Sequence, residues 1–134
     1  MRTIGYISVR TNGWGNKMTM DEFKNRFSLI AKEMMEAEPE NDFLFKQIWK
    51  RLTDLMCEDI HLAIKFLDNA SRNEIDIADS VFEDIAQRID SQEYIDCLYR
   101  LCEKFPELKP DVELAEAFME DLRLKNKNKN SQSR

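Results

Sequence analysis

The chain has 134 residues, of which 43% are hydrophobic and 34% charged, and its formal net charge is −6. This length corresponds to one domain, and the apolar content is sufficient for a hydrophobic core. Every apolar run is shorter than the roughly 18 residues that a membrane-spanning helix needs, so a membrane protein is not expected. The three cysteines form no CxxC pair, which predicts reduced thiols in a cytoplasmic protein.

Residues 1–17 are predicted to form an N-terminal arm. The stretch TIGYISV has the β-branched and aromatic content of a short strand, but no second strand is predicted to pair with it. Two interpretations stay open. Either the arm lies outside the fold, as an upstream extension of a start at Met18 or Met20, or it is a genuine strand or irregular segment that packs on the helices.

The first helix has a complete start signal of its own. Thr19 is followed three residues later by Glu22, which is the spacing of a capping box. Met18 and Phe23 occupy the two positions of a hydrophobic staple, one before the cap and one inside the helix. The folded domain is therefore predicted to begin at residue 18 and to end near residue 124.

The remainder of the domain is predicted to be all-α. Gly15 is the last glycine, and the prolines at 39, 106 and 110 fall between segments of helical periodicity. Six helices are predicted, at about residues 20–36, 40–55, 58–69, 72–89, 91–104 and 110–124. Ser71 with Glu74 and Asp90 with Glu93 repeat the cap spacing. Residues 125–134 contain no apolar side chain and are predicted to be a disordered basic tail.

The helices show an internal repeat. The stretches NDFLFKQI, ADSVFEDI and AEAFMEDL begin at residues 41, 78 and 115, 37 residues apart each time. A period of this size is typical of helix–turn–helix repeats of the tetratricopeptide and HEAT type. The pattern predicts three such units, with a plain six-helix bundle as the alternative. The predicted core includes Phe82, Ile85, Leu98, Leu101 and Phe118.

The charge is distributed unevenly along the chain. Residues 74–121 carry 15 acidic and 4 basic side chains, a net charge of −11, whereas residues 122–134 carry five basic side chains and no acid. Helices that are built only for solubility usually mix the two signs. A field of this sign repels nucleic acid and attracts basic partners.

The acids of the second and third repeats are predicted to form one acidic strip. They recur at helical spacing on the faces opposite the apolar stripes, and the members of the strip are Asp76, Asp79, Glu83, Glu113, Glu116 and Glu120. If the repeats stack, the two rows lie on neighbouring helices about 10 Å apart. The strip is a candidate surface for a basic protein partner. The alternative is a solvated face, in which case exposed tyrosines such as Tyr94 or Tyr99 are the next candidates for a partner surface.

The sequence contains no motif that is typical of an enzyme or of a cofactor site. Paired carboxylates that act on glycosides need a cleft, of which the sequence gives no sign. Di-iron sites in helical bundles need a Glu-x-x-His motif on each of two helices, and with a single histidine the sequence has only one, from Glu58 to His61. A calcium loop needs glycine, which the helical part lacks. We therefore expect no enzyme, no cofactor, no metal, and no nucleic acid or membrane as a partner.

The segment VFEDIAQRIDSQEYIDCLYRLCEKFPELKPDVELAEAFMEDL carries a resemblance to a known family. Its helix hairpins, the stretch SQEYIDCLYRL and the connector KFPELKP resemble the short, acidic, all-helical immunity proteins of bacterial polymorphic and contact-dependent toxin systems. The resemblance covers residues 58–122. It implies a cytoplasmic protein that binds one cognate toxin domain and blocks it, and many toxins of these systems are basic nucleases. The binding residues of that family vary between members, so none is assigned here by position.

Two functions of different classes follow. The first is an immunity protein that neutralises a toxin domain by occluding it with the acidic helical surface. The alternative is a helical-repeat adaptor or regulatory protein that binds a basic host partner. A third and weaker interpretation is nucleic-acid mimicry by an inhibitor of the phage type.

Overall fold

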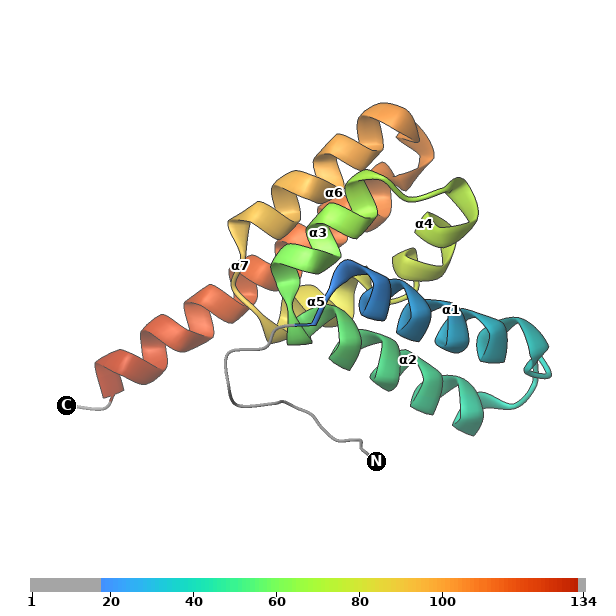
Figure 1. The fold of residues 1–134 in the computed structure, drawn as a ribbon. Coiled ribbons are helices and arrows are strands. Elements are labelled where there is room, and N and C mark those ends of the chain that lie inside the picture. The colour runs from blue at the N-terminus through green and yellow to red at the C-terminus, as the bar shows by residue number, and fades with distance from the viewer. Residues whose placement is uncertain (1–17, 133–134) are drawn as a thin grey trace.

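The computed structural model describes residues 18–132, so the predictions for residues 1–17 lie outside the described part of the chain. Within residues 18–132 every regular element is a helix and no strand occurs, which confirms the all-α class. The elements are α1 (Met20–Glu36), α2 (Asp42–Glu58), α3 (Ile60–Asp68), α4 (Arg72–Asp79), α5 (Phe82–Arg88), α6 (Gln92–Lys104), the 3-10 turn η2 (Pro106–Leu108) and α7 (Lys109–Gln132). Figure 1 shows their arrangement.

The helix starts use the predicted side-chain caps in most places. Thr19 and Ser71 each form a complete capping box with the glutamate three residues later. The start of α6 differs from the prediction, because Ser91 and not Asp90 accepts the hydrogen bond from the backbone, at 3.1 Å from the nitrogen of Tyr94. Asp90 instead forms an ion pair with Arg123 on α7.

The predicted helix 72–89 is two helices in the structure. α4 ends at Asp79 with Ser80 as its C-cap, and Val81, with φ −126° and ψ 13°, is the N-cap of α5. The Ser80 hydroxyl donates to the carbonyl of Ile77 at 2.6 Å, a local bond that competes with the helical ladder. The break turns Val81 and Phe82 together into the core, where neither exposes any surface. The apolar periodicity of residues 72–89 conceals this break, since both helices bury apolar residues.

α7 is longer than predicted. It runs from Lys109 to Gln132, so residues 125–132 are helical where the sequence predicted a disordered tail. Pro110 lies in the first turn, where its missing N–H costs no hydrogen bond, and no glycine or proline follows it to stop the helix. The C-terminal end of α7 projects beyond the other helices, as Figure 1 shows.

Six of the seven α-helices that the structure describes form two layers of three, and α4 connects α3 to α5. Two antiparallel hairpins, α1–α2 and α6–α7, lie at the ends of the fold, with α3, α4 and α5 between them (Figure 1). α3 contacts both α1 and α6 in one layer, while α5 contacts both α2 and α7 in the other. The contact between α5 and α7 is the most extensive in the molecule. It brings residues near 80 against residues near 111.

One continuous core joins these layers. Phe82, Ile85, Leu98 and Leu101 are buried as predicted. Phe118 is only partly buried, and the adjacent Met119 takes the core position with 1% exposure, so the prediction for Phe118 was wrong by one position on the helix. Three further aromatic rings pack together where α1 meets α3, namely Phe23, Phe27 and Phe66.

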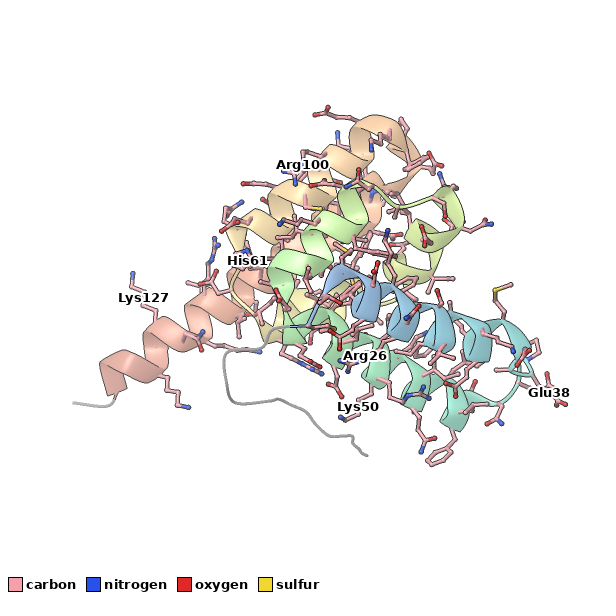
Figure 2. All side chains as sticks on the ribbon, viewed as in Figure 1. Arg26, Glu38, Lys50, His61, Arg100 and Lys127 are labelled. Atoms are coloured by element: carbon pink, nitrogen blue, oxygen red, sulfur yellow. The ribbon has the colours of Figure 1, made fainter. Side chains whose placement is uncertain are left out.

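Arginine–carboxylate pairs lie between the helices at the surface. Each arginine within the described residues pairs with a carboxylate from another element, and the pairs are Arg26–Glu58, Arg51–Glu33, Arg72–Glu107, Arg88–Asp54, Arg100–Asp68 and Arg123–Asp90. Figure 2 labels Arg26 and Arg100 among the exposed side chains. Exposed pairs of this kind contribute little stability each, about 0–1 kcal/mol. They do show where the fold places positive charge against negative charge.

Candidate binding surface

Three acids meet where α4, α5 and α7 come together, and we call them the acidic junction: Asp79, Glu83 and Asp111. Asp79 is the last residue of α4, Glu83 lies in the first turn of α5, and Asp111 lies in the first turn of α7. Asp79 and Asp111 are close enough for their carboxyl groups to share a hydrogen bond. Within the described residues no arginine or lysine forms an ion pair with any of the three.

The electrostatics of the acidic junction favour a proton on one of its carboxyl groups. Desolvation, followed by the neighbouring Asp111, raises the pKa of Asp79 to about 7. Desolvation also raises the pKa of Glu83, and the negative charges of Asp111 and Asp84 add to this effect. Oδ1 of Asp79 is covered and has no hydrogen-bond donor. Two carboxyl groups in contact can hydrogen-bond only if one carries the proton, so Asp79 and Asp111 repel each other once both are ionised.

The core beneath the acidic junction determines its geometry. Val81 and Phe82 are pulled inward by the break between α4 and α5, which leaves Asp79 on one side of the break and Glu83 on the other. The hydroxyl of Tyr94 donates to the carbonyl of Phe82 at 3.3 Å and holds the start of α5 from below. Tyr94 is 1% exposed, so it is not the surface tyrosine that the sequence suggested.

The members of the predicted acidic strip have different partners in the structure. Asp76 pairs with Arg72 at 3.0 Å within α4, and its charge still contributes to the raised pKa of Asp79. Glu113 and Glu120 are exposed on α7, and Glu116 is half-buried against α6. Asp79 and Glu83 stay together without a cation, whereas Asp76 has Arg72 and Glu116 has the hydroxyl of Tyr99.

Glu116 belongs to a contact between α6 and α7. The hydroxyl of Tyr99 donates to its carboxylate at 2.6 Å, and this hydrogen bond is the main cause that raises the pKa of Tyr99 to about 12. Glu113 lies close enough to add to that effect. The pair therefore fastens α6 to α7, and Tyr99 is half-buried rather than free on the surface.

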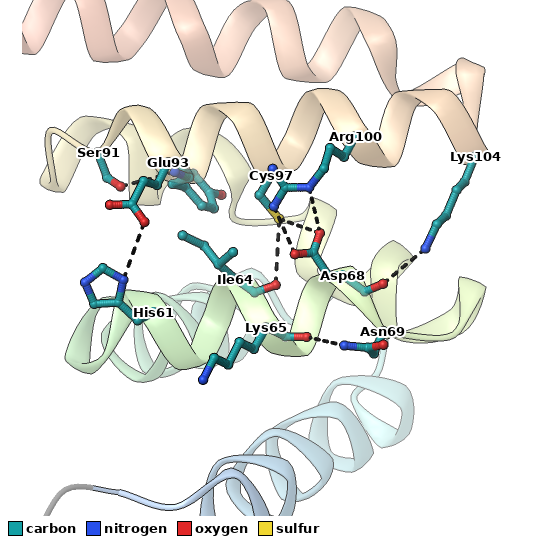
Figure 3. A network of polar contacts seen from close by, with 11 residues as sticks. His61, Ile64, Lys65, Asp68, Asn69, Ser91, Glu93, Cys97, Arg100 and Lys104 are labelled. Atoms are coloured by element: carbon teal, nitrogen blue, oxygen red, sulfur yellow. Dashed lines mark hydrogen bonds and ion pairs between the residues drawn. The ribbon is translucent and has the colours of Figure 1, made fainter.

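The contact between α3 and α6 shows the opposite treatment of a half-buried acid (Figure 3). Asp68 accepts two hydrogen bonds from the guanidinium of Arg100, at 3.1 and 2.9 Å. Lys104 donates to the backbone carbonyl of Asp68 at 3.1 Å. The charge of Asp68 is thereby matched by cations on the facing helix, which the acidic junction lacks.

A shallow hollow of about 370 Å³ near the start of α6 combines a thiol, an imidazole and a carboxylate. Nδ1 of His61 lies 3.7 Å from the carboxylate of Glu93, and both side chains are largely exposed. Burial raises the pKa of the Cys57 thiol, whereas a nucleophilic cysteine needs a lowered pKa. Burial likewise raises the pKa of Cys97 to about 12. These residues do not have the electrostatics of a thiolate catalyst.

The described part of the chain lacks two kinds of feature, a metal-binding group and a membrane-spanning helix. No group of three or more histidine, cysteine, aspartate or glutamate side chains in residues 18–132 could hold a metal ion. In the same part of the chain, no helix is both long and apolar enough to cross a membrane.

Comparison of the chain with protein-family models, with curated proteins and with solved structures finds no match. The function proposed below is therefore based on the geometry and charge of the surface.

Sequence reasoning found two of the three acids of the junction and missed Asp111. The repeat places Asp111 in line with Glu74, 37 residues earlier, and not beside Asp79. Its proximity to Asp79 depends on the break after α4 and on the packing of α5 against α7, neither of which has a signal in the local pattern.

Proposed function

We propose that this protein binds a basic protein partner through the acidic junction, and that it acts by occlusion rather than by catalysis. The observation that carries the proposal is the contact of Asp79 and Asp111, two carboxyl groups with no cation beside them. A lysine or arginine of a partner placed between them would replace the shared proton and relieve their repulsion. The partner would thus supply a cation, as the arginines do for their carboxylate partners elsewhere in the fold.

The biological setting that we propose is immunity to a bacterial toxin. The resemblance of residues 58–122 to acidic helical immunity proteins supports a cytoplasmic protein that covers the active site of a basic toxin domain. Neither nucleic acid nor a membrane is a partner in this proposal, because an unmatched acidic surface repels the phosphates of both.

A helical-repeat adaptor is the second candidate, and the order of helix contacts favours it. α1, α3 and α6 follow one another in one layer, and α2, α5 and α7 do so in the other. This is the order that three stacked HEAT-like or tetratricopeptide-like units would produce. On this reading the basic partner is a host protein, and the acidic junction is part of the adaptor's binding face.

The test compares two charge-reversed baits in a pull-down from the native cell. The first bait carries Asp79→Lys and Glu83→Lys. The matched control carries Glu36→Lys and Glu38→Lys, which change the net charge equally at exposed positions with no ion pair. The partner is the protein that the wild type and the control retain and the junction variant loses. Its purified form should associate more slowly with the junction variant and show a weaker salt dependence.

The two candidates differ in what the partner is and in what its capture does. If the partner is a toxin domain, cells that carry the junction variant lose protection while still accumulating the protein. If the partner is a host protein and no toxicity is involved, the adaptor is correct. Equal retention of every partner by the junction variant and the wild type would refute the acidic junction as the binding surface.

A further inference from the structure

The solvent-facing side of α7 carries a pattern that neither the core nor the acidic junction uses. Val112, Ala115 and Met119 face the core, and Glu116 and Phe118 are half-buried beside them. The exposed positions are Glu113, Leu114, Ala117, Glu120, Asp121, Leu124 and Lys125, continuing to Lys127. Two of them are large apolar side chains, since Leu114 is 45% and Leu124 60% exposed.

Four residues of this face, three of them apolar, have the spacing of a coiled-coil seam. Leu114, Ala117, Asp121 and Leu124 follow one another at intervals of three, four and three residues, and Asp121 is the one charged member. This is the alternating spacing of the a and d positions of a seven-residue repeat. A helix that carries it can pack against a second helix of the same kind, with side chains of one filling gaps in the other.

The seam complements itself when two copies are antiparallel. With a two-fold axis near residue 119, Leu114 of one copy faces Leu124 of the other, and Ala117 faces Asp121. Both exposed leucines then find an apolar partner in one register. A parallel arrangement instead places each residue beside its own copy, which sets like charges against each other.

The charges that flank the seam fit the same register. The start of α7 is acidic, with Asp111 and Glu113, and its end is basic, with Lys125 and Lys127. In the antiparallel pair Asp111 lies beside Lys125 of the second copy, and Glu113 lies beside Lys127. Within the described residues Glu113 and Lys127 form no ion pair, and Lys125 pairs only with Asp121 of its own exposed turn.

These charges cannot meet within one molecule. Glu113 and Lys127 are separated by about 21 Å along an unbroken helix. The C-terminal end of α7 projects away from the other helices, as Figure 1 shows. A nucleic acid would gain from the basic end and be repelled by the acidic start of the same face, whereas a second copy matches both.

We propose that two copies of this chain associate through antiparallel α7 helices, as a weak and salt-sensitive dimer. This proposal goes beyond the binding of a basic partner, because it concerns another occupant and a face of α7 that shares only Asp111 with the acidic junction. The dimer covers Glu113 and brings Lys125 of the second copy to Asp111. A basic partner on the acidic junction and a second copy on α7 therefore compete.

Sedimentation velocity of the full chain over a range of protein and salt concentrations tests the dimer. Lys127→Glu should raise the dissociation constant of the dimer about tenfold, and Glu113→Lys should do the same, since each replaces two attractive contacts per dimer with repulsive ones. The double variant Glu113→Lys with Lys127→Glu exchanges the two charges and should restore the wild-type dissociation constant. Glu120 lies beside its own copy near the two-fold axis, so Glu120→Gln should tighten the dimer.

Lys32→Glu on α1 is the matched control, because it changes the net charge equally at an exposed position far from α7. It should leave the dissociation constant within twofold of the wild type, and circular dichroism checks that every variant is folded. A wild-type chain that stays monomeric up to millimolar concentration overturns the proposal. So does a double variant that fails to recover dimerisation, or a Lys127→Glu variant whose dissociation constant is unchanged, as a parallel pair would give, because one like-charge contact then replaces another.

Discussion

The two ends of α5 treat negative charge in opposite ways. At its C-terminal end Arg88 reaches Asp54 of α2 at 2.5 Å, and this hydrogen bond holds the pKa of Asp54 below its usual range. At its N-terminal end Glu83 lies with two further carboxyl groups, and the pKa of Asp79 rises to about 7.

The two ends belong to one helix of seven residues, and both are partly open to solvent. They differ in two respects: Asp79 is more desolvated, which is the larger cause of its raised pKa, and it has no cation on the facing element, whereas Asp54 has Arg88. At one end the fold supplies its own arginine. At the N-terminal end the fold supplies no cation, so a proton or a cation of a partner takes that place.

The largest effect that we expect tests what holds the acidic junction together. Phe82→Ala should destabilise the domain by about 3–5 kcal/mol, because a fully buried ring leaves a cavity beneath the junction. Phe43→Ala is the control, since that ring is 72% exposed, and it should change the free energy of unfolding by less than about 0.5 kcal/mol. Urea denaturation measures both. A loss below about 1 kcal/mol for Phe82→Ala would mean that α5 does not pack as described.

The second effect comes from removing one charge of the junction. A carboxyl group with a raised pKa is protonated in the folded state, so its stabilising contribution is complete below pH 4 and is lost as the pH rises through 7. Asp79→Asn should therefore stabilise the domain at pH 8 by about 1–2 kcal/mol, after allowance for solvent screening of a half-buried group. The gain should disappear at pH 4, and Glu38→Gln should show no such pH dependence. A loss of stability at pH 8 would contradict this electrostatic picture.

The third effect applies the same substitution at the other end of α5. Asp54→Asn should cost about 0.5–1 kcal/mol at pH 7, because it removes the charge from an exposed pair with Arg88. A lowered pKa contributes stability above pH 4 that is lost as the pH falls through the folded value, so the cost should vanish in acid. Equal signs for Asp54→Asn and Asp79→Asn at pH 8 would remove the difference between the two ends.

The smallest effect concerns the end of α7. Deleting residues 126–134 should change the melting temperature of the dilute, monomeric protein by no more than a degree or two, because the described side chains of residues 126–129 are exposed. A fall of several degrees, measured by differential scanning fluorimetry, would show that this segment makes contacts that stabilise the monomer.

Much of the fold was predictable because local signals define it. The caps at Thr19 and Ser71, the prolines and the apolar stripes predicted an all-α domain with nearly correct helix ends. Two features were not. Periodicity continues across the break at Ser80, and a segment without apolar residues still extends α7 because nothing in it terminates a helix.

The candidate surface was predictable only in part, for a similar reason. Charge counting located the acidic half of the chain, and Asp79 and Glu83 were among the predicted residues. Counting cannot show which acids have a cation opposite them, because the arginines that pair with Asp54, Asp68 and Asp90 come from distant segments. In the structure those three acids have arginine partners, whereas Asp79, Glu83 and Asp111 form no ion pair within the described residues.

The most direct test of this account is a carboxyl-detected NMR titration of the free protein that follows Asp79 and Asp54 in the same sample. The account predicts that Asp79 titrates near pH 7, while Asp54 titrates below the usual range of an aspartate. A titration of Asp79 at or below pH 4 would mean that its charge is already matched within the fold. The acidic junction would then offer a basic partner no more than any other solvated helix face.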